Sequence, residues 1–222
     1  MDTAKNLKNF GRTNGRPLGP EARYMLEELL PRYLASVEKM PPRDETNYLE
    51  IGFGYGESLA EMASREQWAN YFGCEVYRRG IINLLKLMLA RRIDNIGIFN
   101  GDAQIFLDLV EDRYFNGIFI LFPDPWPKRK QQKRRFINID SLGLLQRKLK
   151  VDSPLFFASD SEEYAKSVLE TVQNSHLFRQ IPKNLEDCCA EPSWWVETKY
   201  HRKAKAQNRK VFFLESRAGL SI

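Results

Sequence analysis

The chain has 222 residues, 43% of them hydrophobic and 12% aromatic, a length that fits one ordinary domain with a sizeable core. Its longest apolar-rich run, residues 81–90, contains Asn83 and Lys86 and is too short to cross a membrane, so no transmembrane segment is predicted. Two histidines and three cysteines without CxxC spacing argue against a disulfide framework and against a metal site. No secretory signal is recognisable at the N-terminus, so we expect a cytoplasmic protein.

The net charge of +5 is unevenly distributed along the chain. Residues 1–19, 128–135 and 197–210 carry +3, +6 and +5, and the remaining residues sum to −9. Because each lysine or arginine placed on a phosphate releases condensed counterions, this distribution favours a polyanionic partner. The alternative is an ordinary solvated charged surface.

The apolar pattern predicts a helix over residues 20–38, bent at Pro31, followed by an alternation of strands and helices. The predicted strands are residues 47–51, 71–75, 96–100, 117–122 and 154–159, and the predicted helices are residues 57–64, 79–92, 103–111, 134–150 and 161–174. This order predicts an α/β fold in which parallel strands and right-handed crossovers form a three-layer sandwich. Residues 194–200 and 209–215 predict an antiparallel C-terminal hairpin at one sheet edge.

A glycine-rich turn follows the first predicted strand and contains Glu50, Gly52, Gly54 and Gly56. Ligands of parallel sheets bind beyond the carboxyl ends of the strands, where glycine lets the backbone approach them closely. The spacing does not fit the dinucleotide pattern GxGxxG, because the sixth position is Glu57 when counted from Gly52 and Leu59 when counted from Gly54. An acidic residue before GxGxG resembles the first motif of S-adenosylmethionine-dependent methyltransferases, although a purely structural turn is the alternative.

Polar residues also follow the next two predicted strands. Glu75 can accept both hydrogen bonds of a ribose diol, or it can pair with Arg78 or Arg79. The third predicted strand ends at Asn100, which places Asp102 where the amino group of an adenine would lie, although Asp102 could instead cap the following helix. Because the ends of these strands share one rim of the sheet, the three signals together favour a ligand site there.

The most specific segment is the run ILFPDPWPKRKQQKRR at residues 120–135. Three prolines fix the backbone after the fourth predicted strand and present Asp124 and Trp126 at the rim where a methyl acceptor should lie. Trp126 is predicted either to stack on a base or to anchor the loop by packing. The basic run follows at once.

Together FPDPWPK, the KRR cluster, EIGFGYGES, GCEVYRRGI and NGDA resemble the tRNA (guanine-N7)-methyltransferase family over nearly the whole chain. FGRTNGRPLGP and TKYHRKA resemble the family's basic N-terminal arm and its C-terminal motif. The resemblance implies a Rossmann-like class I methyltransferase, with a basic flexible arm at residues 1–19 and one methyltransferase domain at residues 20–222. It also implies methyl transfer from S-adenosylmethionine to N7 of a guanine in the variable loop of tRNA, position 46 in tRNA numbering.

The resemblance further assigns roles to individual residues. The residues expected to contact the cofactor are Glu50, Gly52, Gly54, Gly56, Glu75, Asn100, Asp102 and Asp124, of which Asp124 is also catalytic. Those expected to contact the substrate are Lys128, Asp160, Thr198, Lys199, Tyr200 and His201, with Lys133, Arg134 and Arg135 on tRNA phosphates. Because guanine N7 carries a lone pair and no proton, no general base is needed.

One position departs from the family, which usually has glutamate where this chain has His201. A carboxylate can accept both donors of the Watson–Crick edge of guanine, whereas a neutral histidine has one acceptor nitrogen. Asp160 is expected to take more of that work, unless Ser159 or Asp160 caps the next helix.

Two rival functions are a methyltransferase with another acceptor and a non-catalytic RNA-binding module. The first leaves the proline–tryptophan loop beside a basic run unexplained, and the second leaves the acidic strand ends unexplained. The sequence is compatible with a monomer and with a homodimer.

Overall fold

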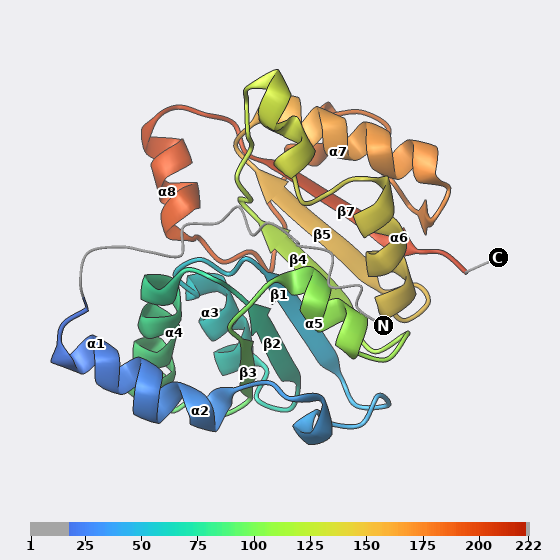
Figure 1. Ribbon diagram of the computed structural model, residues 1–222. Helices are drawn as coiled ribbons and strands as arrows, with labels where there is room; N and C mark the ends of the chain where they lie inside the picture. The colour runs from blue at the N-terminus through green and yellow to red at the C-terminus, as the bar shows by residue number, and fades with distance from the viewer. Residues whose placement is uncertain (1–17, 221–222) are drawn as a thin grey trace.

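A seven-stranded sheet forms the centre of the molecule in the computed structural model, which describes residues 18–220 (Figure 1). The strands are β1 (Asn47–Ile51), β2 (Asn70–Cys74), β3 (Ile96–Phe99), β4 (Gly117–Leu121), β5 (Pro154–Ser159), β6 (Phe178–Arg179) and β7 (Phe212–Ala218). Their order is β3-β2-β1-β4-β5-β7-β6, and β1 to β5 pair in parallel. The predicted mostly parallel α/β sheet is therefore confirmed. Apart from residues 18 and 19, the expected basic arm lies outside the described residues.

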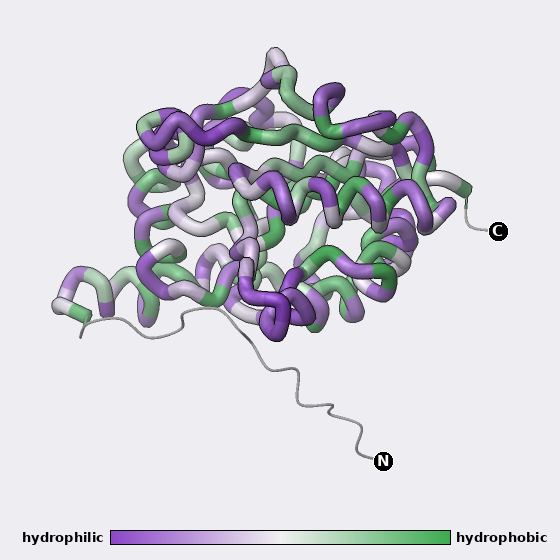
Figure 2. Tube along the Cα trace, turned by 90° about the horizontal axis from the view of Figure 1, so that it is seen from above, coloured by the Kyte–Doolittle hydropathy of each residue, from purple (hydrophilic) through white to green (hydrophobic). Residues whose placement is uncertain are grey.

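Helices cover both faces of the sheet, and a separate group of buried side chains lies under each layer. One layer contains α1 (Pro20–Tyr24), a π-helical turn (Met25–Leu29), α2 (Leu30–Tyr33), α3 (Glu57–Arg65), α4 (Arg78–Arg91) and α8 (Lys199–Ala206). The other contains α5 (Ala103–Leu109), α6 (Ile139–Lys148) and α7 (Glu162–Ser175). Hydrophobic segments run through the middle of the molecule between these layers (Figure 2).

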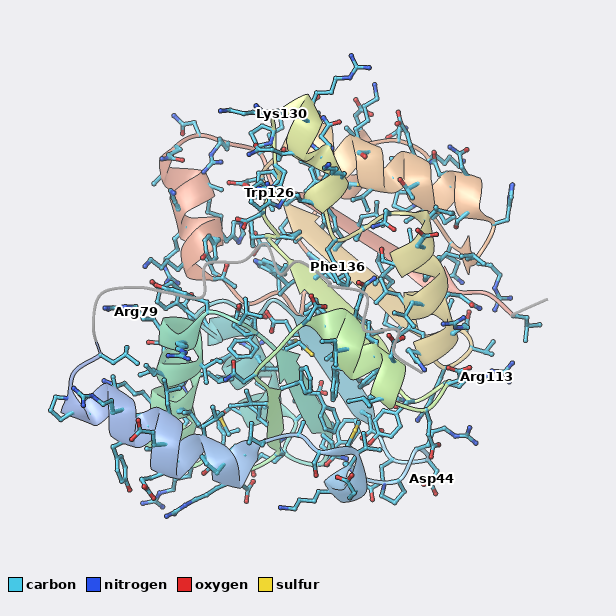
Figure 3. All side chains as sticks on the ribbon, viewed as in Figure 1. Asp44, Arg79, Arg113, Trp126, Lys130 and Phe136 are labelled. Carbon is cyan, nitrogen blue, oxygen red and sulfur yellow. The ribbon has the colours of Figure 1, made fainter. Side chains whose placement is uncertain are left out.

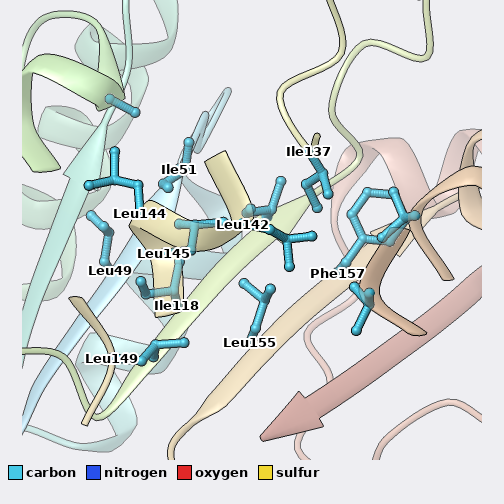
Figure 4. Close-up of a cluster of buried hydrophobic side chains, with 14 of the residues drawn as sticks. Leu49, Ile51, Ile118, Ile137, Leu142, Leu144, Leu145, Leu149, Leu155 and Phe157 are labelled. Atoms are coloured by element: carbon cyan, nitrogen blue, oxygen red, sulfur yellow. The ribbon is translucent and has the colours of Figure 1, made fainter. Parts of the chain in front are cut away.

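The core follows from the two periodicities of the sequence. β4 reads GIFIL and is buried at every position, as expected for a central strand that is covered on both faces. Leucines of α6 that recur every three or four residues, including Leu142 and Leu145, lie against Ile118 and Leu155 of the sheet (Figure 4). Each such buried side chain contributes about 1.5–3 kcal/mol, so this packing holds β4 and β5 in place below the site.

Two predicted helices differ from those observed. The helix predicted over residues 20–38 ends at Tyr33. Before Pro31, which has no amide donor, the backbone forms a π-helical turn instead of a bend. In place of the helix predicted over residues 134–150, the structure has a 3-10 segment, η3 (Arg129–Arg134), followed by the shorter helix α6. Helix α6 begins after Asn138 because Asn138 and Ser141 form a reciprocal capping box.

The predicted C-terminal hairpin is wrong in its pairing. β7 is antiparallel, but its neighbours are β5 and the two-residue β6. Residues 194–197 form no strand, and Trp194 and Trp195 instead pack their rings on Phe156 of the sheet. Thr198 then caps α8 by accepting the backbone N–H of His201.

Further connecting 3-10 turns lie at Val37–Lys39 (η2) and Glu186–Cys188 (η4). Within residues 18–220, no helix is long and apolar enough to cross a membrane.

Candidate active site

A cleft of about 1150 Å³ lies beyond the carboxyl ends of the central strands. The strand order reverses between β1 and β4, which is the point where ligands bind in open parallel sheets. The walls of the cleft come from the turn after β1, the segments that follow β2 and β3, the loop after β4 and the start of α8. The lining residues are 50–58, 75–77, 102, 104, 120–127, 133–136, 138, 198 and 200. In Figure 3, Trp126 and Lys130 lie at this end of the sheet, opposite Asp44 and Arg113, which precede β1 and β4.

The turn after β1 has a left-handed backbone at all three predicted glycines. Gly52, Gly54 and Gly56 have φ of +69°, +56° and +74°, values that side chains with a Cβ rarely adopt. A Cβ on Gly56 would also lie 2.8 Å from the side chain of Leu84. The glycines therefore bring α3 close to α4 and leave the backbone of the turn open to the cleft.

Gly80 is a site residue that the sequence interpretation missed. It lies in the first turn of α4, and a Cβ there would be 1.9 Å from the carbonyl oxygen of Gly54. The signal was present, because a glycine inside an otherwise helical pattern indicates close approach of another backbone. Gly80 lets α4 support the glycine turn directly.

Glu75 connects the glycine turn to the end of β2. Its Oε1 accepts the N–H groups of Val76 (2.7 Å) and Tyr77 (2.9 Å), and its Oε2 accepts the N–H of Gly54 (2.7 Å). Burial raises the pKa of Glu75, and these three hydrogen bonds oppose the rise. The carboxylate is thus fixed in the cleft, where the remaining lone pair of Oε2 can accept a donor from a ligand.

Glu50 is a buried carboxyl group at the end of β1. It is 2% exposed, and its Oε2 has no hydrogen-bond partner. Burial, and then the nearby charge of Glu75, raise the pKa of Glu50 to about 8. Because buried polar atoms are normally paired, this unpaired oxygen at the cleft fits a hydrogen bond with a bound ligand.

The pKa of Glu50 predicts a fall in stability with pH. The folded protein keeps a proton here above the ordinary pKa of 4.5 and loses it near pH 8. The free energy of unfolding should therefore fall over that window by up to about 1.4 kcal/mol per pH unit. Glu50→Gln should remove this fall in urea titrations between about pH 5 and about pH 8, while Glu162→Gln, an exposed change in α7, should not. Parallel profiles for Glu50→Gln and the wild type would refute the prediction.

Of the two polar residues after β3, only Asp102 lines the cleft. It also accepts the N–H of Gln104 (2.8 Å) and caps α5, so its capping role is confirmed. Asn100 is exposed next to this position.

The loop after β4 presents Asp124 to solvent at the cleft. Phe122 and Trp126 have φ of +50° and +42°, an uncommon conformation for bulky residues that surrounding contacts must maintain. The guanidinium of Arg134 lies 4.9 Å from the centre of the Trp126 ring. The proline-rich loop is therefore held in a strained conformation with Asp124 at its tip.

The opposite wall of the cleft is formed by the start of α8. Thr198 and Tyr200 both line the cleft, and the Tyr200 ring stacks on Phe122 at 6.2 Å between centroids. Glu57, the first residue of α3, accepts the backbone N–H of Lys199 and a side-chain N–H of Arg202 (2.9 Å). These contacts tie α8 to the glycine turn.

Four predicted substrate residues are not part of the cleft lining. Lys128 is exposed, Lys199 places its ammonium 4.3 Å from the Tyr55 ring centre, and Asp160 pairs with Arg209 at 2.6 Å. His201 is 2% exposed.

The structure places His201 on the buried side of α8. Its Nδ1 accepts the indole N–H of Trp195 at 2.6 Å, and burial lowers its pKa, which favours the neutral imidazole that this bond needs. The expected contact of His201 with substrate is therefore not supported. The alternative role of Ser159 or Asp160 as a helix cap is not observed, because Ser161 caps α7.

The three predicted phosphate ligands lie in different environments. Lys133 is exposed and Arg134 is half-buried. Arg135 has 7% of its side chain exposed and pairs with Glu163 at 3.0 Å. Among residues 18–220, no group of His, Cys, Asp and Glu side chains could hold a metal ion.

Comparison with known proteins shows the family of this chain. The profile of a family described as putative methyltransferase matches residues 44–214. A tRNA (guanine-N(7)-)-methyltransferase of Hyphomonas neptunium is 32% identical over 214 residues, which cover 93% of this chain and 98% of that protein. The chain belongs to the tRNA (guanine-N7)-methyltransferase family.

Other relatives are longer or share only the fold. A bifunctional methyltransferase of Rickettsia conorii is 39% identical over 207 residues, covering 93% of this chain, and the chain spans only 39% of that protein's length. The crystal structure of an rRNA methylase from Streptococcus thermophilus superposes with a TM-score of 0.54 at 13% identity, covering 88% of this chain and 95% of that one. The predicted Rossmann-like class I methyltransferase fold is confirmed.

Proposed function

We propose that this chain transfers the methyl group of S-adenosylmethionine to N7 of a guanine in the variable loop of tRNA, position 46 in tRNA numbering, and so forms 7-methylguanosine. One observation carries the proposal: a single cleft joins the glycine turn to the loop of Asp124 and the basic segment after it. The name of the Hyphomonas neptunium relative, which aligns over almost its full length, supports this acceptor.

The residues at the glycine turn fit S-adenosylmethionine, the methyl donor of the family. A Cβ on Gly52 would point into open space at the cleft, and the unpaired Oε2 of Glu50 offers an acceptor beside it. Glu75 would accept a ribose hydroxyl through the remaining lone pair of Oε2, and Asn100 and Asp102 would contact the adenine. When bound, the cofactor supplies an electrophilic methyl group on a positively charged sulfur.

Catalysis in this cleft is a matter of alignment and charge. Guanine N7 has an in-plane lone pair and no proton, so no residue has to act as a general base. Asp124, exposed at the tip of its loop, would orient the reacting groups and stabilise the cationic purine that forms. Asp124 and Tyr200 both line the cleft.

The guanine would lie between the two walls of the cleft. Thr198 and Tyr200 line the wall of the cleft at α8, and Trp126 lines the wall at the loop after β4. The aromatic ring of Trp126 can stack on a base that is turned out of the folded tRNA. Lys128, Asp160 and Lys199 would contact the tRNA at the margin. His201 would hold α8 in place through Trp195.

The basic segment after Asp124 would bind phosphates of the tRNA. Mutation of this segment should therefore reduce the salt dependence of tRNA binding. The double change Lys133→Ala and Arg134→Ala should weaken tRNA binding and reduce the slope of log Kd against log salt by about one to two. The control Lys166→Ala removes an exposed charge from α7, outside the cleft, and should leave the slope unchanged. An unchanged slope in the double variant would place phosphate contact elsewhere.

We also propose that residues 20–222 act as one methyltransferase domain, with residues 1–19 as a basic arm on the tRNA, because that segment carries +3. We propose that the chain acts as a monomer or as a homodimer. A tRNA substrate favours the cytoplasm as the site of action.

The proposal is tested by incubating the purified protein with S-adenosylmethionine and unmodified tRNA, digesting the RNA and analysing nucleosides by mass spectrometry. We expect 7-methylguanosine as the methylated product. Cofactor binding with a different methylated nucleoside would show another acceptor, and tRNA binding without cofactor binding would show an RNA-binding module.

A further inference from the structure

Arg135 lies beneath the loop that carries Asp124. Its Nε donates a hydrogen bond to the carbonyl oxygen of Pro125 at 2.8 Å, and its Nη2 donates to Glu163 Oε1 of α7 at 3.0 Å. Its guanidinium carbon lies 4.8 Å from the centre of the Tyr164 ring. One side chain thus joins the loop after β4 to the start of α7.

These contacts use the features that distinguish arginine from lysine. The planar guanidinium donates in two directions while its face lies on an aromatic ring, and a lysine ammonium cannot reproduce this arrangement. With 7% of the side chain exposed, the charge is compensated inside the protein, as a buried cation requires. Arg135 therefore has little of its surface left for an external phosphate.

The loop needs such an anchor. Pro125 and Pro127 have no N–H to donate to neighbouring segments, and Trp126 has an unfavourable φ of +42°. The carbonyl of Pro125, between Asp124 and Trp126, is the group that Arg135 holds. Gln132 of η3 donates to the same Glu163 Oε1 at 2.5 Å, so Glu163 also fixes the segment that precedes Arg135.

We infer that Arg135 is a positioning residue that fixes the Asp124–Pro127 loop through Pro125, with Glu163 as its support, and that it is not a phosphate ligand. This inference rests on the proposed function for its kinetic consequence, because a displaced Asp124 slows methyl transfer only if Asp124 acts in that reaction. The position of the loop itself is independent of the substrate.

A positioning role and a phosphate-binding role for Arg135 predict different results for each of the variants Arg135→Lys and Glu163→Gln. If Arg135 positions the loop, Arg135→Lys should lower the single-turnover rate at saturating tRNA about 10- to 100-fold, with the tRNA Kd and its salt dependence close to wild type. Glu163→Gln should lower the same rate by a smaller factor. If Arg135 binds phosphate, lysine should preserve the rate, and removal of the Glu163 carboxylate should tighten tRNA binding.

Hydrogen–deuterium exchange of the free protein provides a readout that does not depend on activity. We expect Arg135→Lys to speed amide exchange at Phe122 and Gln131, whose N–H groups donate to the carbonyls of Ala158 and Lys128, while leaving the strands β4 and β5 protected. Lys133→Met, which removes an exposed cation from the same segment, should lower the salt slope without this faster exchange. Wild-type exchange in Arg135→Lys would overturn the inference, whereas faster exchange in a protein that methylates no tRNA would refute only the proposed function.

Discussion

Asp124→Asn is expected to lower the rate of methyl transfer about 100-fold or more while changing tRNA affinity little. The substitution keeps the shape of the side chain and removes the charge that would stabilise the cationic purine. Asp124 lies exposed at the tip of a loop fixed by prolines and by Arg135, so the change should not disturb the fold.

The measurement is a single-turnover rate at saturating tRNA and cofactor, compared with tRNA binding under the same salt conditions. Asp108→Asn is the control, because Asp108 is an exposed residue of α5 outside the cleft, and its rate should match the wild type. Equal losses of rate and of tRNA affinity in Asp124→Asn would show that Asp124 binds the substrate without a specific role in the transition state.

Gly80→Ala should have the largest effect on the cofactor site. The new methyl group would lie 1.9 Å from the carbonyl oxygen of Gly54, so either α4 or the glycine turn must move. Overpacking of this kind costs about 1–3 kcal/mol, and if that cost falls on the turn, the Kd for S-adenosylmethionine rises about tenfold for each 1.4 kcal/mol. Calorimetric titration with the cofactor measures the change.

Gly143→Ala provides a matched control for this substitution. Gly143 lies within α6, and a Cβ there meets no atom within 4 Å. Alanine is the better helix former by about 0.8–1 kcal/mol, so this variant should melt at a higher temperature and bind the cofactor normally. Normal cofactor affinity in Gly80→Ala would contradict the role of Gly80 in supporting the turn.

Local patterns were sufficient for the parallel half of the fold. β5 was predicted with its observed bounds, and β1 likewise, because each is a short buried run followed by a clear turn signal. The glycine turn, Glu75 and Asp102 were placed correctly at the cleft because the ends of parallel strands share one rim. These features depend on neighbours in sequence and on one general rule of topology.

The errors arose where contacts between distant residues decide the outcome. Trp194 and Trp195 belong to a residue type that is common in strands. However, the two-residue strand β6 pairs with β7, and the two tryptophans pack on Phe156. Arg135 sits in a basic run that reads as surface, and its inward direction depends on Glu163 in another element. No local pattern encodes either contact.

The central claim, methylation of guanine N7 in the variable loop, is tested most directly by mapping the modified position. Two transcripts of one tRNA, one with the variable-loop guanine and one with adenine in its place, are incubated with the protein and S-adenosylmethionine and then cleaved at 7-methylguanosine. We predict one cleavage in the variable loop of the first transcript and none in the second. Cleavage elsewhere, or equal cleavage of both transcripts, would contradict the proposed substrate site.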